Sequence, residues 1–215
     1  MKKGVKIALI STAFVAALTT GIILWKRKKK TVVKAVTDGK GNTVQLNEIQ
    51  SAILTEATKW VGVREIVENK GFENKEFQNK ITANAGWVKN EAYCAAFIKM
   101  VLVEVSSGNA KKFFKQNASK GSLLTWQNLS KKNEYTEVIK VPEAGCLVCY
   151  NGHTEICKST DGKVNTVISA NSPFTAQDGG GQGVVERTRP AGAPIQGDKG
   201  KVEPFLGYIR IKKLS

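Results

Sequence analysis

Cys94 and His153 have the residue types and sequence positions that nucleophilic chemistry requires. Cys94 opens an apolar run, CAAFIKMVLVEV, which ends at Val105 and predicts a largely buried helix. A thiol at a helix N-terminus faces the positive end of the helix dipole and unpaired N–H groups, which favour the nucleophilic thiolate. His153 is the only histidine of the chain, and imidazole is the usual base for such a nucleophile. The alternative for Cys94 is a small hydrophobic residue at the start of a core helix.

The sequence around His153 predicts a β-hairpin. Asn151-Gly152 is a preferred two-residue hairpin turn, and this register places Cys146 opposite Cys157. Side chains alternate between the two faces of a strand, so His153, Glu155 and Cys157 should share one face of the returning strand.

Three cysteines lie close to His153 in the sequence and allow two further interpretations. Cys146, Cys149, His153 and Cys157 together have a spacing near that of a compact zinc site. Strand alternation weakens the zinc hypothesis, because it turns Cys149 to the opposite face from the other three residues. A Cys146–Cys157 disulfide is the second interpretation, for a domain outside the cell, although a directly opposed pair is sterically demanding.

The patterns that must position these residues are helical first and strand-like later. Apolar residues follow helical spacing from Asn47, a suitable N-cap, to Gly62, and Ser122–Lys131 predicts a further short helix. Candidate strands separated by Asn-Gly, Asp-Gly and Gly/Pro-rich turns are Cys146–Tyr150, His153–Lys158, Val164–Ser169, Gly183–Thr188 and Phe205–Ile211. Helices followed by strands predict an α+β fold with a largely antiparallel sheet.

Several motifs then occur in an order found in a known family. An aromatic-Cys-Ala-Ala-Phe sequence opens the helix at Cys94, VPEAGCLVCYNGHTEI contains a Pro-x-x-Gly lead into one strand with His153 starting the next, and VISANSPF follows. The region from Ala57 onward thereby resembles the CHAP and NlpC/P60-type papain-like cysteine peptidases, which are peptidoglycan hydrolases. The resemblance implies a papain-like fold in which N-terminal helices pack on an antiparallel β-sheet.

The same resemblance implies catalytic roles for three residues. Cys94 is the nucleophile, His153 its base, and Asn171 the polar residue that orients the imidazole. The family often has an acidic residue two positions before this asparagine, where the chain has Ser169. It also usually has Asp after the glycine that leads into the strand, where Cys146 stands. The implied activity is that of an amidase or endopeptidase that cleaves an amide of peptidoglycan without a metal or cofactor.

Four more residues are candidate substrate contacts. Tyr93 and Trp87 are candidates for the walls of the cleft, with core packing as the alternative for two aromatic residues. Glu65 and Asn69 lie in a Gly-Val-Arg-Glu-x-x-x-Asn stretch that resembles the segment before the nucleophile in these hydrolases. We expect them to contact peptide or sugar, with stabilisation of a loop as the alternative.

The N-terminal segment predicts a membrane anchor. Ile7 to Trp25 is an uncharged run followed by KRKKK, and about 20 apolar residues cross a bilayer. We therefore assign 1–30 as one transmembrane helix with a basic flank, 31–46 as a linker or small hairpin, and 47–215 as the hydrolase domain. A cleaved signal peptide is the alternative, but its apolar run is usually shorter.

We expect a single-pass membrane protein with its catalytic domain on the cell-wall side, although the heavier basic flank biases the C-terminal side toward the cytoplasm.

The net charge of +15 does not indicate a nucleic-acid partner, because residues 1–34 hold most of the excess and contain no acidic residue. The predicted partners are peptidoglycan and the lipid bilayer, and the resemblance implies a bacterial or phage source. The alternative function is a catalytically silent module of a secretion apparatus or phage virion that retains the fold.

Overall fold

The computed structural model describes residues 34–38, 40–177, 179–197 and 200–215. The predicted anchor, 1–30, lies outside these residues. Among the described helices, none has both the length and the apolar character that a membrane crossing needs.

Two helix boundaries in the described chain follow clear local sequence signals. The first helix begins after Asn47, whose side chain accepts a hydrogen bond from Gln50 N while the Gln50 side chain accepts one from Asn47 N. Another helix ends at Gly86, which has the left-handed φ of 71° typical of a C-cap. The described helices are α2 (Glu48–Thr58), α3 (Lys75–Ala85), α4 (Cys94–Val105), α5 (Gly108–Asn117) and α6 (Ser122–Leu129).

Six strands form one antiparallel sheet in the order β5-β12-β6-β7-β8-β9. They are β5 (Thr136–Ile139), β6 (Leu147–Tyr150), β7 (Thr154–Thr160), β8 (Val164–Pro173), β9 (Gln182–Pro190) and β12 (Phe205–Ile211). Three of the expected strands lie within β8, β9 and β12, and the other two begin one residue before β6 and β7. The α+β class with an antiparallel sheet is confirmed. The sequence patterns did not indicate β5, α3 or α5.

Three small antiparallel pairs complete the described elements. They are β1 (Ala35–Thr37) with β2 (Thr43–Gln45), β3 (Glu65–Val67) with β4 (Gly71–Phe72), and β10 (Ile195–Gln196) with β11 (Val202–Glu203). The first pair gives the described part of the predicted linker the form of a small hairpin.

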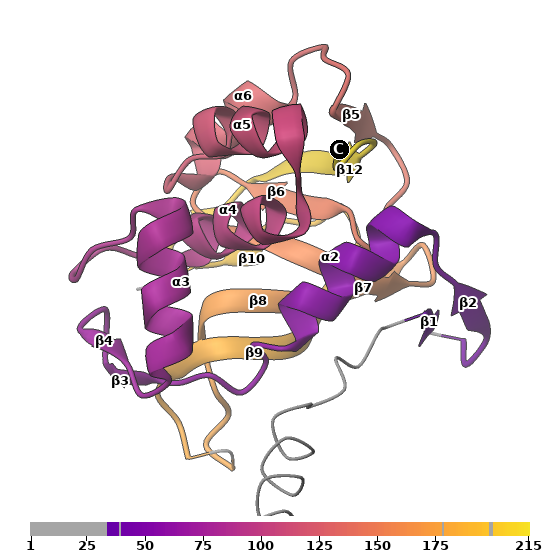
Figure 1. The fold of residues 1–215 in the computed structure, drawn as a ribbon. Helices are drawn as coiled ribbons and strands as arrows, with labels where there is room; N and C mark the ends of the chain where they lie inside the picture. The colour runs from indigo at the N-terminus through magenta and orange to yellow at the C-terminus, as the bar shows by residue number, and fades with distance from the viewer. Residues whose placement is uncertain (1–33, 39, 178, 198–199) are drawn as a thin grey trace, which may run out of the picture. The chain divides into compact units, whose positions relative to one another are not determined.

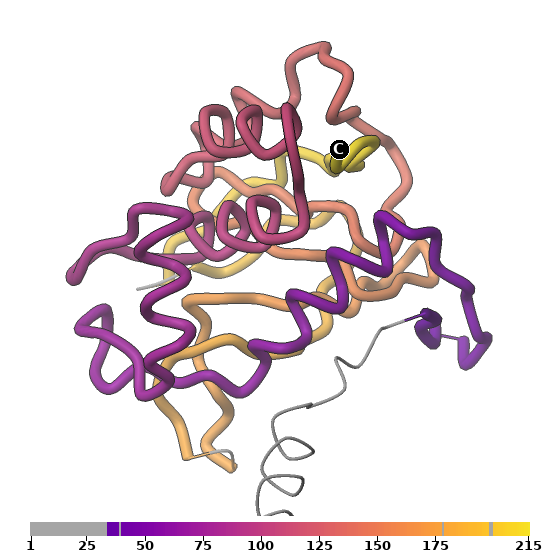
Figure 2. Tube along the Cα trace, viewed as in Figure 1, coloured from indigo at the N-terminus to yellow at the C-terminus, as the bar shows by residue number. Residues whose placement is uncertain are grey.

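The central helix α4 packs against one face of the sheet, with α2 and α3 beside it (Figures 1 and 2). Its residues from Cys94 to Ile98 and from Met100 to Val103 are buried, as the apolar run predicts. They share a core with Leu147 of β6, Ile156 of β7 and Ile168 of β8. Burying one large apolar side chain stabilises a fold by about 1.5–3 kcal/mol, so this helix is held firmly in place.

A second, smaller apolar cluster contains Val148, Tyr150, Cys157 and Tyr208, with Ile195 of β10 against them. Strand alternation separates it from the main core, because neighbouring residues of β6 and β7 contribute to different clusters.

Candidate active site

Cys94 is the first residue of α4, as the sequence predicts, and the preceding Tyr93 provides no side-chain cap for the helix. The first N–H groups of the helix therefore have no side-chain acceptor from the cap residue. Asn171 Oδ1 accepts a hydrogen bond from Tyr93 N at 3.3 Å, which ties the start of α4 to strand β8. Cys94 is 5% exposed, so its sulfur lies at the floor of a cleft.

His153 reaches Cys94 from the turn between β6 and β7. The predicted register is confirmed, since Cys149 pairs with Thr154 and Tyr150 N donates to His153 O at 2.8 Å. Neither Asn151 nor Gly152 has a positive φ, so the geometry differs from the usual Asn-Gly turn.

Gly152 is instead required by space. A Cβ on this residue would lie 2.4 Å from the Glu203 carboxyl carbon.

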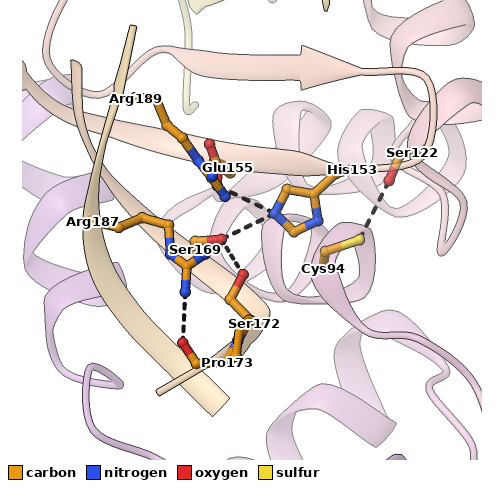
Figure 3. A network of polar contacts seen from close by, with 9 residues as sticks. All are labelled: Cys94, Ser122, His153, Glu155, Ser169, Ser172, Pro173, Arg187 and Arg189. Carbon is orange, nitrogen blue, oxygen red and sulfur yellow. Dashed lines mark hydrogen bonds and ion pairs between the residues drawn. The ribbon is translucent and has the colours of Figure 1, made fainter. Parts of the chain in front are cut away.

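The imidazole of His153 lies between the thiol and two polar side chains. Nε2 is 3.0 Å from Ser169 Oγ and 3.3 Å from Glu155 Oε1. Figure 3 shows the other ring nitrogen on the side of Cys94. Ser169 Oγ is also 2.6 Å from Ser172 Oγ. Both ring nitrogens are therefore engaged, which fixes the orientation of the ring relative to the sulfur.

Asn171 was the partner predicted to orient the imidazole, and the structure places other side chains against the ring. Strand β8 has an irregular register between Ser169 and Ser172, and Asn171 adopts a φ of 56°. The Asn171 side chain consequently contacts Tyr93 N, while Ser169 and Glu155 contact the ring. Asn171 still lines the cleft with Cys94 and His153.

Cys94 and His153 shift each other's proton affinity in opposite directions. Burial on its own raises the pKa of Cys94, but the charge of His153 and hydrogen bonds from His153 and Ser122 lower it below its usual value. Burial lowers the pKa of His153, whereas the Cys94 thiolate and then Glu155 raise it to about 10. The two shifts describe one coupled pair, which favours a thiolate beside an imidazolium.

The fully buried Glu155 carboxylate contacts two cationic side chains. Besides His153 Nε2, its Oε1 accepts a hydrogen bond from Arg189 Nη2 at 3.1 Å. Burial raises the pKa of Glu155, but His153 and Arg189 outweigh that effect and lower it to about 2. Glu155 therefore remains ionised and stabilises the imidazolium form of His153.

Ser122 completes the surroundings of the sulfur. It is the first residue of α6, and its Oγ lies 3.4 Å from Cys94 Sγ. The hydroxyl can donate a hydrogen bond to the thiolate, which contributes to the lowered pKa of Cys94.

The cleft above Cys94 has a cavity volume of about 300 Å³ and is lined mainly by polar residues. Its charged side chains beyond the His153 network are Arg187, Arg189, Lys201 and Glu203. A nucleophile, a protonated base and several hydrogen-bonding groups thus face one solvent-connected space, an arrangement suited to acyl transfer.

Comparisons of this chain with protein-family models, with characterised proteins and with solved structures found no match.

The predicted substrate contacts lie away from the cleft. Tyr93 and Trp87 do not line it, because both are buried in an aromatic cluster with Phe72 and Phe77. The alternative of core packing describes them correctly.

Glu65 is the first residue of β3, and Asn69 lies in the turn that joins β3 and β4. The buried Glu65 carboxylate accepts a hydrogen bond from Asn69 N, and Asn69 has a φ of 55°. Their positions correspond to the alternative of stabilising a loop.

The zinc and disulfide interpretations depended on cysteines outside this network. Cys157 N donates to Cys146 O at 2.9 Å, which confirms that the two residues oppose each other, and both thiols are free. Cys149 packs in the main core on the other face of the sheet. The residues that the structure describes contain no cluster of three or more His, Cys, Asp or Glu side chains suited to a metal ion.

Several residues of the network were not predicted as site residues. Strand alternation had placed Glu155 on the same face as His153, and this was the available signal for its role. Nothing local in the sequence indicated Arg189 or Ser122, because each comes from an element that only the folded chain brings to Cys94.

Proposed function

We propose that this protein is a peptidoglycan hydrolase that cleaves an amide bond with Cys94 as nucleophile and His153 as base. The observation that carries the proposal is the position of His153, with one ring nitrogen on the side of Cys94 and the other within 3.3 Å of Glu155 Oε1. A thiol with a lowered pKa and an imidazole with a raised pKa, both lining a cleft, are the groups that cysteine-dependent acyl transfer needs.

The finer part of the fold proposal is papain-like architecture. Its support is a cysteine at the start of a helix that packs on an antiparallel sheet, with the histidine at the start of a strand in that sheet. The motif resemblance around Cys94 and His153 supports peptidoglycan as the substrate. It also supports the proposal that the domain lies beside the cell wall.

The reaction starts from the thiolate–imidazolium pair. Cys94 Sγ attacks the amide carbonyl, forming a carbon–sulfur bond while the carbonyl oxygen takes the negative charge. The imidazolium of His153 then donates its proton to the leaving amine as the carbon–nitrogen bond breaks. The neutral imidazole next removes a proton from water, which attacks the thioester and releases a carboxylic acid and the Cys94 thiolate.

The other residues stabilise charge during these steps. Glu155 and Ser169 hold the ring through Nε2, so the nitrogen beside Cys94 carries the mobile proton. The backbone N–H of Cys94, at the uncapped start of α4, is the candidate donor to the carbonyl oxyanion. Ser122 Oγ, 3.4 Å from Cys94 Sγ, is the candidate hydrogen-bond donor to the attacking thiolate.

The proposal is tested by incubating the purified full chain with defined peptidoglycan fragments and identifying the products by mass. Cys94→Ala and His153→Ala should each lower the rate by several orders of magnitude. Cys146→Ala is the matched control, because it removes a buried thiol of the smaller apolar cluster, outside the Cys94–His153 network. An intact fragment after incubation with wild type, or equal digestion by Cys94→Ala, contradicts the proposal.

The catalytically silent alternative makes a separate prediction for the thiol. If the domain were only a binding module, Cys94 would react with a thiol reagent no faster than a free cysteine does. Fast labelling of Cys94 that depends on His153 supports the enzyme.

A further inference from the structure

Arg187 of β9 lies beside the catalytic network and lines the same cleft as Cys94 and His153. Figure 3 shows its guanidinium near Ser172 and Pro173, on the β8 side of the site. The proposed reaction mechanism gives it no role.

The other two cationic side chains of the cleft wall form ion pairs, whereas Arg187 forms none within the described part of the chain. Arg189 pairs with Glu155 at 3.1 Å, and Lys201 pairs with Glu203 at 3.2 Å. Among the residues that the structure describes, no carboxylate forms an ion pair with Arg187.

The hydrogen bonds of Arg187 are also incomplete. Nη2 donates to Pro173 O at 2.6 Å, whereas Nε is buried without a partner in the described structure. A guanidinium has five N–H donors arranged to match a carboxylate, and leaving a buried donor unpaired costs free energy. The Arg187 guanidinium is thus held at Nη2 by Pro173 O, while its Nε–H has no acceptor among the described residues.

Burial lowers the pKa of Arg187, and the charge of Arg189 lowers it further, while the charge of Glu155 offsets only part of the two effects. Arg187 is thus a partly buried cation with no carboxylate within ion-pair distance among the described residues. An incoming anion would relieve both effects by supplying the opposite charge and the missing acceptors.

A second cavity, of about 660 Å³, adjoins the catalytic cleft at Arg187. The two share Pro173, Arg187 and Arg189 in their linings. In the second cavity the Arg64 guanidinium stacks on Phe174, 3.9 Å from the ring centroid, and donates to Gly180 O at 2.8 Å. Arg187 therefore lies where the two cavities meet, and a substrate that extended from Cys94 into the second cavity would pass it.

We propose that Arg187 binds a free carboxylate of the substrate beside the scissile amide, so that the enzyme prefers an acidic peptide to its carboxamide counterpart. This inference rests on the proposed amide hydrolysis, and it adds the charge of the substrate class. A peptide carboxylate fits because the guanidinium presents parallel donors to its two oxygens.

The kinetic test uses two defined peptidoglycan fragments that differ only in a carboxylate or carboxamide near the cleaved bond. Wild type should show a kcat/KM about tenfold higher for the carboxylate, mainly through KM, which corresponds to about 1.4 kcal/mol. Arg187→Gln should reduce the ratio toward one, and Arg187→Lys should give an intermediate ratio because the charge remains without the paired donors.

Lys201→Gln is the matched control, since it removes one positive charge from the same cleft but from a residue already paired with Glu203. It should preserve most of the preference. Equal hydrolysis of both fragments by wild type, or an unchanged ratio in Arg187→Gln, overturns the role of Arg187 and leaves the proposed function standing.

A second measurement is independent of peptidoglycan hydrolysis. Iodoacetate and iodoacetamide both alkylate the Cys94 thiolate with loss of iodide, but only iodoacetate carries a carboxylate. The ratio of their rates at Cys94, followed by mass, should fall about threefold or more in Arg187→Gln and little in Lys201→Gln. An equal fall in both variants, or none in Arg187→Gln, rejects specific binding by Arg187 even if wild type digests neither fragment.

Discussion

Glu155 Oε1 lies 3.3 Å from Nε2 of His153, on the side of the imidazole away from Cys94. The family resemblance suggests an acidic residue at the position of Ser169, yet here the carboxylate comes from the neighbouring strand and Ser169 provides a hydroxyl to the same nitrogen. Because Glu155 is fully buried and also paired with Arg189, its charge acts on the ring through an environment of low dielectric.

Glu155→Gln should lower kcat/KM by about tenfold or more and narrow the pH range of activity. Glu155 contributes to the raised pKa of His153, so removing its charge lowers that pKa. The imidazolium is then lost at a lower pH, and the alkaline limb of the rate profile moves toward acid. The measurement is kcat/KM against pH for both proteins, and an alkaline limb that does not move contradicts this role for Glu155.

Cys94 should remain partly thiolate below the pH at which an ordinary thiol ionises. In wild type, its rate of alkylation by iodoacetamide should show a midpoint below the usual cysteine value, because His153 lowers the pKa of Cys94. His153→Ala removes that charge and leaves burial, so the midpoint should rise. A midpoint that is the same in the two proteins would show that the thiol and imidazole are not coupled.

We expect Asn171 to hold the start of α4 and not to orient the imidazole of His153. Asn171→Ala should destabilise the protein by about 1–2 kcal/mol, because it removes the acceptor for Tyr93 N. Asn171→Gly should cost less, since glycine adopts the φ of 56° without strain.

Thermal or denaturant unfolding measures both Asn171 variants, and the alkaline limb of activity provides the check. If Asn171→Gly moves that limb as Glu155→Gln does, Asn171 orients the imidazole after all.

Gly152→Ala should displace the Glu203 carboxylate, because the added Cβ would lie 2.4 Å from its carbon. We expect a loss of stability of about 1 kcal/mol and slower hydrolysis, since Gly152 and Glu203 both line the cleft. Glu203→Ala removes the obstacle, so Gly152→Ala should cost less in that background. Unfolding of the two single variants and the double variant gives the coupling energy, and additive costs would refute the steric explanation.

Local patterns in the sequence determined the parts of the site that depend on neighbours in the chain. The apolar run from Cys94 to Val105 predicts α4 because its side chains must be buried on nearly every side. The turn at Asn151-Gly152 predicts the pairing of β6 with β7, and alternation along β7 then relates His153 to Glu155. These patterns were sufficient to predict the α+β class and to bring Cys94 and His153 together as the candidate nucleophile and base.

Only the tertiary structure decided which side chains complete the site. The register shift in β8 reverses the expectation for Asn171, and a bulge of this kind depends on contacts with β9 and α4. Arg187 and Arg189 come from β9, an edge strand distant in sequence from Cys94. Charge complementarity between such segments arises only when folding buries them together, and it therefore has no local signature in the sequence.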